Sequence, residues 1–492
     1  MRASGVLLHL SSVPSPYGIG TMGQSAREFI DFLKDAGQKY WQILPVGQTS
    51  YGDSPYQSFS SFAGNPYFID LDMLAEEGLL ESGEYETIAW GDKPDKVDFG
   101  VLYEQRYPLL RLAVKRFCLK EQSGFAEFCR EQNRWLEDYA LFMTIKGLNH
   151  GASWLEWKEE ERKRFPETIE KIRNTNQEEI LFWKVIQFFF YEQWKALRTY
   201  ANDNGISIIG DLPIYVALDS ADIWANPQYF QLDEALMPIQ VAGCPPDGFA
   251  EGGQLWGNPL FDWEALERDG FSWCIKRIGH SCQIYNVLRL DHFRGFESYY
   301  AIPYGDKDAR GGHWETGPGE KLFRAMEKQI GKQNMIAEDL GFLTESVREL
   351  LKNSGFPGMK VFELGFDSRD GNGSEYLPHN LIPNCVAYAG THDNDTIQGW
   401  FSTAPAEDVE YACAYFGIED KSRGHWKVMK ALWSTVADLT IVQAQDLLGL
   451  SSESRMNQPS TFGENWRWRA LPGVFTAELA EKLRENMKLY AR

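Results

Sequence analysis

Eight short apolar runs, spread along the chain and separated by helical patterns, constrain the fold more than any other feature. Most are almost continuously apolar, as expected for strands of a parallel sheet buried on both faces. Helical patterns lie between several of them, over 23–37, 321–331 and 344–355, and the last two end at a glycine. Eight such strands alternating with helices predict an α/β protein, a (β/α)8 TIM barrel. The predicted strands are residues 5–10, 39–44, 206–211, 286–291, 334–339, 359–364, 385–393 and 439–446.

The spacing of the runs indicates where this barrel carries extra structure. The long segment between the second and third runs is rich in charge and in helical periodicity. We therefore expect a single catalytic barrel over residues 1–492, with large, mainly helical insertions on its C-terminal rim. The largest insertion is expected over 72–190, between the second and third strands. The glycine-rich segment 243–259 is expected to be a flexible active-site loop.

The charge of the chain restricts its partners. The 492 residues include 70 acidic and 49 basic ones, for a formal net charge of −21. Nucleic acids and anionic membranes both require basic protein surface, so neither is expected as a partner. The 17 Trp, 22 Tyr and 30 Phe suit core packing, but rings with polar tips also make platforms for sugars. Seven scattered cysteines, with no apolar run of membrane-spanning length and no convincing signal peptide, indicate a cytoplasmic protein.

Acidic residues recur where the apolar runs end, at Asp211, Asp291, Glu338 with Asp339, and Asp393. In a TIM barrel the active-site groups come from the carboxyl ends of several strands. Any single acid of this kind can instead cap the following helix or pair with an arginine. Four such strand ends at one rim favour an active site. Neutral polymers such as glycans are cleaved by two carboxyl groups of unequal protonation, so acids at these strand ends fit that chemistry.

The stretch N-V-L-R-L-D-H-F-R-G-F, residues 286–296, contains the most informative pair. Arg289 and Asp291 share one face of a strand, so the arginine is expected to favour the ionised aspartate, as a nucleophile requires. Glu338 follows an apolar run, and partial burial would favour its protonated form, as a general acid requires.

The segment G-T-H-D-N-D offers further polar groups. His392 and Asp393 are expected to hold sugar hydroxyls. Asp395 precedes a helical pattern and is expected to cap it. His379 fits a substrate subsite and a hydrogen-bonded loop histidine equally well.

Three segments, R-L-D-H-F-R-G, I-A-E-D-L-G and G-T-H-D-N-D, resemble the catalytic segments of the amylomaltases. These are the 4-α-glucanotransferases, or disproportionating enzymes, of glycoside hydrolase family 77 in the α-amylase clan. Four further blocks resemble the family's signatures in the expected order, at 44–71, 210–227, 245–259 and 455–469. The resemblance implies a retaining transferase that moves α-1,4-glucan segments between malto-oligosaccharides, starch or glycogen. It also implies a covalent glucosyl-aspartate intermediate, no cofactor or metal, and a monomer or homodimer.

The resemblance implies roles for individual residues as well. Asp291 resembles the family's nucleophile, Glu338 its acid and base, and Asp393 the third carboxylate, which holds the 2- and 3-hydroxyls of a distorted sugar ring. Other positions resemble residues that contact the glucan: Arg289, His392, Asp211, Tyr56, Ser54 and His292 around the sugar, Trp256, Asn465 and Asp367 toward the acceptor, and Tyr51 at a secondary glucan site.

The chain departs from the family in one block, and two other functions stay open. The family often carries a tyrosine after P-P-D, where this chain has Gly248 followed by Phe249. An α-1,4-glucan hydrolase would use the same three carboxylates as a transferase. A non-catalytic glucan-binding protein would be expected to lack one or more of them.

Overall fold

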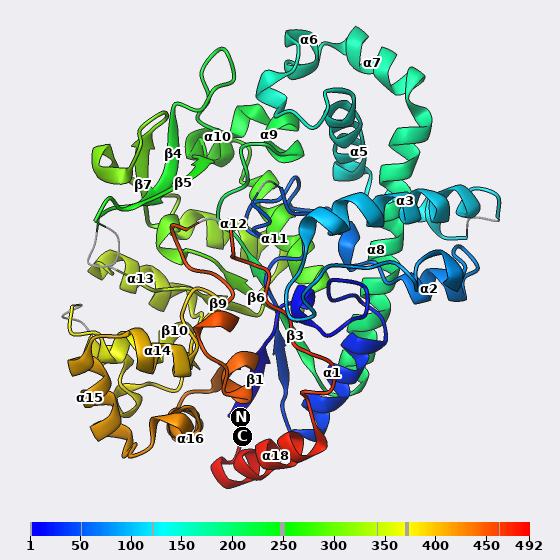
Figure 1. The fold of residues 1–492 in the computed structure, drawn as a ribbon. Helices are drawn as coiled ribbons and strands as arrows, with labels where there is room; N and C mark the ends of the chain where they lie inside the picture. Colours follow the sequence, from blue (N-terminus) through cyan, green and yellow to red (C-terminus); the bar gives the residue numbers. More distant parts are fainter. Residues whose placement is uncertain are drawn as a thin grey trace.

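Eight parallel strands form a closed barrel at the centre of the molecule (Figure 1). The computed structural model describes residues 2–50, 52–120, 123–246, 251–341, 343–369, 373–461 and 463–492. The barrel strands are β1 (Ala3–Leu7), β2 (Tyr40–Gln42), β3 (Ser207–Leu212), β6 (Val287–Leu290), β9 (Met335–Ala337), β10 (Gly358–Val361), β11 (Cys385–Tyr388) and β12 (Leu439–Gln443). Around the barrel they follow the order β1, β12, β11, β10, β9, β6, β3, β2. Each overlaps one of the eight predicted runs, so the predicted (β/α)8 fold is confirmed.

The interior of the barrel is filled at one level by apolar side chains and at the next by charged ones. Ile209 of β3 and Val287 of β6 belong to an apolar cluster inside the barrel, separate from the larger core outside it. Leu288 and Leu290 belong to the outer core. Because side chains alternate along a strand, the residues two positions after Ile209 and Val287, Asp211 and Arg289, also face the interior. The pleat of the strands therefore brings these charges to the carboxyl end of the barrel.

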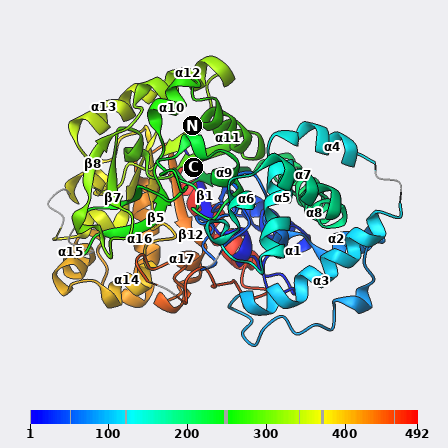
Figure 2. The same cartoon turned by 90° about the horizontal axis from the view of Figure 1, so that it is seen from above.

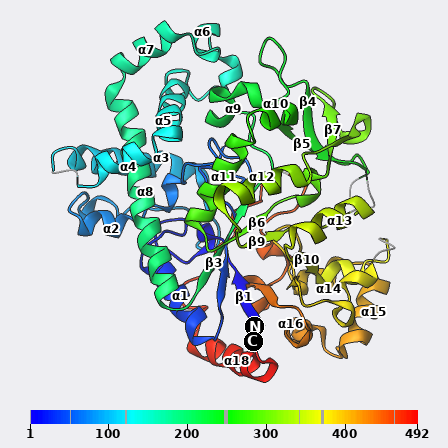
Figure 3. The ribbon, with the colours of Figure 1, turned by 180° about the vertical axis from the view of Figure 1, so that it is seen from behind.

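Helices surround the barrel, as Figure 3 shows from behind. The helices predicted over 23–37, 321–331 and 344–355 are present as α1, α12 and α13. The last is capped by the Thr344 hydroxyl, and Gly355 ends it with a φ of +70°, a conformation that favours glycine. The helices outside the segment between β2 and β3 are α1 (Gln24–Asp35), α9 (Ala221–Ala225), α10 (Trp263–Arg268), α11 (Ser272–Ile284), α12 (Glu320–Ile330), α13 (Glu345–Ser354), α14 (Ile397–Thr403), α15 (Ala406–Phe416), α16 (Gly424–Ser434), α17 (Ala444–Leu448) and α18 (Ala477–Tyr490).

The segment between β2 and β3 is helical. Its helices are α2 (Leu71–Glu76), α3 (Phe99–Phe117), α4 (Phe125–Glu131), α5 (Asn133–Leu148), α6 (Glu159–Arg162), α7 (Pro166–Thr175) and α8 (Gln177–Asp203). The aromatic rings of Phe117, Phe125 and Phe188 pack against one another and join α3, α4 and α8. The apolar contacts of this segment are continuous with the core outside the barrel.

A four-stranded antiparallel sheet lies on the other side of the barrel from these helices (Figure 2). Its strands are β4 (Gln240–Cys244), β5 (Gln254–Pro259), β7 (Ser298–Pro303) and β8 (His313–Thr316), in the order β5, β4, β7, β8. The sequence did not predict this sheet. β4 and β5 take up both ends of the segment 243–259, which was expected to be a loop. Strand pairing between β4 and β7 joins residues about sixty positions apart, which local patterns do not reveal.

The two ends of the described chain lie side by side at the base of the barrel (Figure 1). The guanidinium of Arg492 donates hydrogen bonds to several main-chain carbonyls there, including those of Ala3 and Ala437 at 3.0 Å. Within the described residues, no helix combines the length and the apolar character needed to cross a membrane.

Candidate active site

The guanidinium of Arg289 joins three of the acids that the sequence singled out. Its Nη1 atom lies 2.6 Å from Oδ2 of Asp211 and 3.2 Å from Oδ1 of Asp291. Its Nη2 atom lies 3.1 Å from Oε2 of Glu338. Asp211 is the register partner of Arg289 between β3 and β6, and Ile336, two residues before Glu338, is its partner on β9. The parallel register therefore brings these side chains together at one end of the barrel.

His292 supplies a second support for Glu338. Its backbone φ of +47° lies in the left-handed region that non-glycine residues seldom adopt. In this conformation its N–H donates a hydrogen bond of 2.6 Å to Oε2 of Glu338. The imidazole lies edge-on to the indole of Trp256, with ring centroids 4.9 Å apart. Trp256 on β5 thus contacts the same residue that positions the Glu338 carboxylate.

Asp291 and Glu338 both have raised pKa values. Burial and the neighbouring Glu338 carboxylate raise the pKa of Asp291 to about 8, against the opposing effect of Arg289. Burial likewise raises the pKa of Glu338. Two neighbouring carboxylates do not both ionise readily, so the titration of each group depends on the charge of the other. The sequence predicted that Glu338 holds the proton of a general acid, but Arg289 and the His292 amide stabilise negative charge on Glu338.

Asp393 lies beside a stack of aromatic rings. Its Oδ1 atom lies 3.4 Å from Nε2 of His392, whose pKa is lowered by burial, so the imidazole is neutral. The His392 ring is stacked on Tyr56 with centroids 5.0 Å apart, and Trp466 packs against both rings. Asn457 donates a hydrogen bond of 2.6 Å from Nδ2 to Oδ1 of Asp393. The Asp393 side chain is 45% exposed, so its carboxylate is accessible to a ligand.

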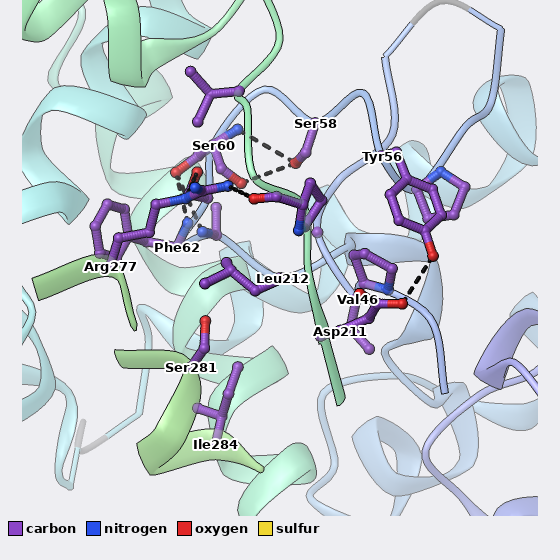
Figure 4. Close-up of a pocket in the computed structure, with 18 of the residues that line it drawn as sticks. Val46, Tyr56, Ser58, Ser60, Phe62, Asp211, Leu212, Arg277, Ser281 and Ile284 are labelled. Carbon is purple, nitrogen blue, oxygen red and sulfur yellow. Dashed lines mark hydrogen bonds between the residues drawn. The ribbon is translucent and has the colours of Figure 1, made fainter. Parts of the chain in front are cut away.

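Tyr56 connects this ring stack to Asp211, which pairs with Arg289. Its hydroxyl donates a hydrogen bond of 2.9 Å to Oδ2 of Asp211, and Ser54 supports the turn before it by accepting the Tyr56 N–H at 3.2 Å. Behind these residues lies a small cavity of about 50 Å³ (Figure 4). Burial raises the pKa of Asp211 to about 6, and its Oδ1 atom is buried without a hydrogen-bond partner among the described residues. That atom is available to a ligand hydroxyl or a buried water.

Two of the residues predicted on the acceptor side are bonded within their own loops. Asn465 donates from Nδ2 to the Thr461 carbonyl at 3.0 Å, so its amide is engaged within its own loop. Asp367, at the end of the 3-10 helix η8 (Phe362–Phe366), forms an ion pair of 2.7 Å with Arg369. Tyr51 lies outside the described residues, as do Gly248 and Phe249. In the described part of the chain no three His, Cys, Asp or Glu side chains are grouped so that they could hold a metal ion.

Three other residues that the sequence analysis considered form hydrogen bonds away from the Arg289 guanidinium. Asp339 turns away from the arginine group and accepts the Met359 N–H at 2.6 Å. Asp395 was predicted to cap a helix, but Thr396 is the residue that caps α14, and Asp395 instead accepts the Ser452 hydroxyl at 2.7 Å. The prediction was wrong by one residue because both side chains can accept a backbone N–H. His379 bonds the Tyr415 hydroxyl at 2.7 Å, which fits the loop histidine of the two alternatives.

Sequence reasoning missed two polar groups next to the predicted site. Glu363 accepts the Asn394 amide at 3.0 Å, and burial raises its pKa to about 8. It is the last residue but one of the apolar run 359–364, so a search for acids near the ends of these runs would have found it. Asn457 lies in a block already quoted for its resemblance, but nothing local in the sequence indicates its bond to Asp393.

Comparison with known proteins identifies the family. The model of the 4-alpha-glucanotransferase family, glycoside hydrolase family 77, matches residues 8–473. The chain is 50% identical over 487 residues to the 4-alpha-glucanotransferase of Clostridium butyricum, covering 99% of this chain and 100% of that protein. It is 46% identical over 494 residues to the 4-alpha-glucanotransferase of Streptococcus pneumoniae strain TIGR4, covering 100% and 97%. The amylomaltase from Streptococcus agalactiae in complex with acarbose has a similar structure, with a TM-score of 0.96, 42% identity and full coverage of both chains. The chain therefore belongs to the 4-α-glucanotransferase family, glycoside hydrolase family 77.

Proposed function

We propose that this 4-α-glucanotransferase moves segments of α-1,4-linked glucan between malto-oligosaccharides by a retaining double displacement. Asp291 is the nucleophile and Glu338 the general acid and base. The observation that carries the proposal is the partly buried pair itself, with the Asp291 side chain 24% and the Glu338 side chain 19% exposed. Asp291 and Glu338 interact with each other and with Arg289, and both have raised pKa values. One ionised and one protonated carboxyl group are what such a reaction requires.

The first half-reaction cleaves the donor. A carboxylate oxygen of Asp291 forms a bond to the anomeric carbon, and the bond from that carbon to the glycosidic oxygen breaks. Glu338 gives its proton to the departing oxygen, and the reducing-end part of the glucan leaves with a new 4-hydroxyl group. Arg289 stays cationic beside both carboxyl groups and balances the charge that moves between them.

The second half-reaction uses another glucan as acceptor. Its 4-hydroxyl attacks the anomeric carbon of the glucosyl ester, Glu338 takes the hydroxyl proton, and the bond to Asp291 breaks. The products are a lengthened glucan and the original state of the pair. Two inversions at one carbon give net retention of the α-configuration.

Asp393, His392 and Tyr56 form the proposed sugar-binding side of this site. A carboxylate, a neutral imidazole and a ring stack offer acceptors, a donor and an apolar face to one glucose unit. The unsatisfied Oδ1 atom of Asp211 is a further acceptor for a sugar hydroxyl. Interactions of this kind accelerate the reaction when they are stronger in the distorted transition state than with the relaxed substrate.

Transfer prevails over hydrolysis only if the acceptor excludes water from the ester. We assign that task to Trp256, which packs against His292 on the Glu338 side, and to segment 455–469 on the Asp393 side. We further propose residues 1–492 as one catalytic unit, with 72–190 as its helical insertion and 243–259 as an active-site segment.

Incubation with maltotriose tests the proposal. Transfer produces glucose and a ladder of longer chains while the total number of reducing ends stays constant. Hydrolysis, which uses the same carboxylates, raises that number. The Asp291→Asn variant should lose turnover and keep glucan binding. Wild-type protein that binds maltotriose without converting it would instead indicate a non-catalytic glucan-binding protein.

A further inference from the structure

The segment that follows α17 and the 3-10 turn after it holds Asp393 through two side chains. Asn457 donates from Nδ2 to Oδ1 of Asp393 at 2.6 Å, and its backbone N–H donates to the His392 carbonyl at 3.0 Å. Arg455 donates to the main-chain carbonyls of Asp393 at 2.5 Å and of Asn457 at 2.8 Å. We infer that Asn457 is a positioning residue that aims the Asp393 carboxylate at the bound sugar. This inference rests on the proposed role of Asp393.

The two carboxylate oxygens of Asp393 have different surroundings. Oδ1 faces Asn457 on one side and His392, at 3.4 Å, on the other. No hydrogen bond from the described residues reaches Oδ2. With the side chain 45% exposed, the geometry leaves Oδ2 as the atom that meets sugar hydroxyls. An amide donor fixed to Oδ1 sets the rotation of the carboxylate, because a charge-assisted hydrogen bond is short and directional.

The backbone of Asp393 is held independently of Asn457. Its N–H donates to the Thr391 hydroxyl at 3.3 Å, and Thr391 in turn bonds the Asn394 side-chain oxygen through its N–H and its hydroxyl. The Asn394 amide is fixed at its other end by Glu363 at 3.0 Å. These contacts, with that of Arg455, keep the main chain in place. Removing the Asn457 amide therefore releases the carboxylate without releasing the loop.

Asn457 also connects Asp393 to the acceptor-side segment. The carbonyl of Met456 accepts the Trp466 N–H at 2.7 Å, and the Asn465 side-chain oxygen accepts the N–H of Gln458 at 3.0 Å. Residues on both sides of Asn457 in the chain are thus bonded to the part of the segment that carries Asn465. A displacement of this part by an acceptor glucan would be transmitted to the carboxylate that holds the donor sugar.

Three variants of the full chain test the inference. Asn457→Leu keeps the side-chain volume and removes the donor, and Asn457→Asp keeps the shape and places a like charge against Asp393. Asn202→Leu is the control, because this exposed side chain near the end of α8 forms no hydrogen bond within the described residues and has no part in the proposed site. With maltotriose we expect kcat to fall about tenfold for the leucine variant and further for the aspartate variant, with KM within about twofold. The control should match the wild type.

A double-mutant cycle distinguishes positioning from a general structural role. Binding of acarbose is measured by tryptophan fluorescence for the wild type, Asn457→Leu, Asp393→Asn and the double variant. If Asn457 acts through Asp393, the leucine substitution weakens binding in the wild type and has no further effect beside Asp393→Asn. Equal losses in both backgrounds, or an unchanged kcat in Asn457→Leu, would overturn the inference. Failure of the proposed function itself shows differently, as turnover that survives in Asp291→Asn.

Discussion

The Nη1 atom of Arg289 lies closer to Asp211, at 2.6 Å, than to Asp291, at 3.2 Å. Arg289 therefore does not pair with Asp291 alone. It is a buried cation that forms ion pairs with three acids, because its planar guanidinium has two terminal nitrogens that contact different carboxylates. Asp211 fixes the guanidinium, and the guanidinium orients Asp291 and Glu338.

Replacing Arg289 by lysine should lower kcat/KM by at least about 100-fold. A single ammonium cannot reproduce contacts of two nitrogens with three carboxylates, and buried acids without a partner destabilise the site. Steady-state transfer from maltotriose measures the loss. Arg348→Lys is the matched control, because Arg348 pairs with Glu375 near the surface and should lose little. Near wild-type activity in Arg289→Lys would contradict the shared-cation arrangement.

The raised pKa of Glu338 predicts that the alkaline limit to activity lies above the ordinary carboxyl range. Burial raises this pKa, so Glu338 keeps the proton that it must donate to a higher pH than an exposed glutamate does, and activity falls once that proton is lost. A pH profile of kcat/KM for transfer measures this alkaline limb, the fall in activity at high pH. Burial also raises the pKa of Glu363 to about 8, so Glu363→Gln is the control. The limb should persist in that variant, and its disappearance would assign the titration to Glu363 instead.

Asp291 and Glu338 also make the free energy of unfolding depend on pH. Their carboxyl groups have folded pKa values above their ordinary range, so the folded protein binds more protons than the unfolded chain between about pH 4 and pH 8. The contribution of the pair to the free energy of unfolding therefore declines as the pH rises through this window. Denaturant titrations at several pH values should show a shallower decline in Glu338→Gln, which has one buried acid fewer. An identical pH dependence in both proteins would exclude this contribution.

Truncating Trp256 to alanine should raise the share of hydrolysis severalfold. The indole covers His292 on the Glu338 side, and its loss opens that side to water while the three carboxylates stay in place. The ratio of new reducing ends to transfer products from maltotriose measures the change. Leu255→Ala is the control, because Leu255 is the neighbour of Trp256 on β5 and is 41% exposed. If both variants hydrolyse to the same extent, the indole does not have the proposed task.

Replacing Arg492 by alanine should lower the free energy of unfolding by about 2 kcal/mol. Its guanidinium bonds the carbonyls of Ala3 and Ala437 and others near the end of α16, and the substitution leaves these acceptors without a charged donor. Thermal unfolding followed by circular dichroism measures the loss. Arg484→Ala removes an exposed i,i+3 ion pair with Glu481 and should change stability by less than about 0.5 kcal/mol.

The sequence by itself determined the barrel and its acids. Apolar runs of strand length alternate with helical patterns. A strand that is buried on both faces is almost entirely apolar, so it can be recognised from its own residues. Acids at the ends of such strands meet at one rim because parallel strands all end there, so Asp211, Asp291 and Glu338 could be grouped before any coordinates.

Only the tertiary structure decided how those acids share charge and what holds them. The pKa of Asp291 depends on a carboxylate 47 positions later in the chain, and the orientation of Asp393 depends on an amide 64 positions later. The antiparallel sheet of β4, β5, β7 and β8 could not be predicted from the sequence for the same reason. Its strands are short, and their partners lie far along the chain or on the other side of a segment that resembles a loop. Electrostatic and hydrogen-bond energies depend on distances in space, and local periodicity contains no information about them.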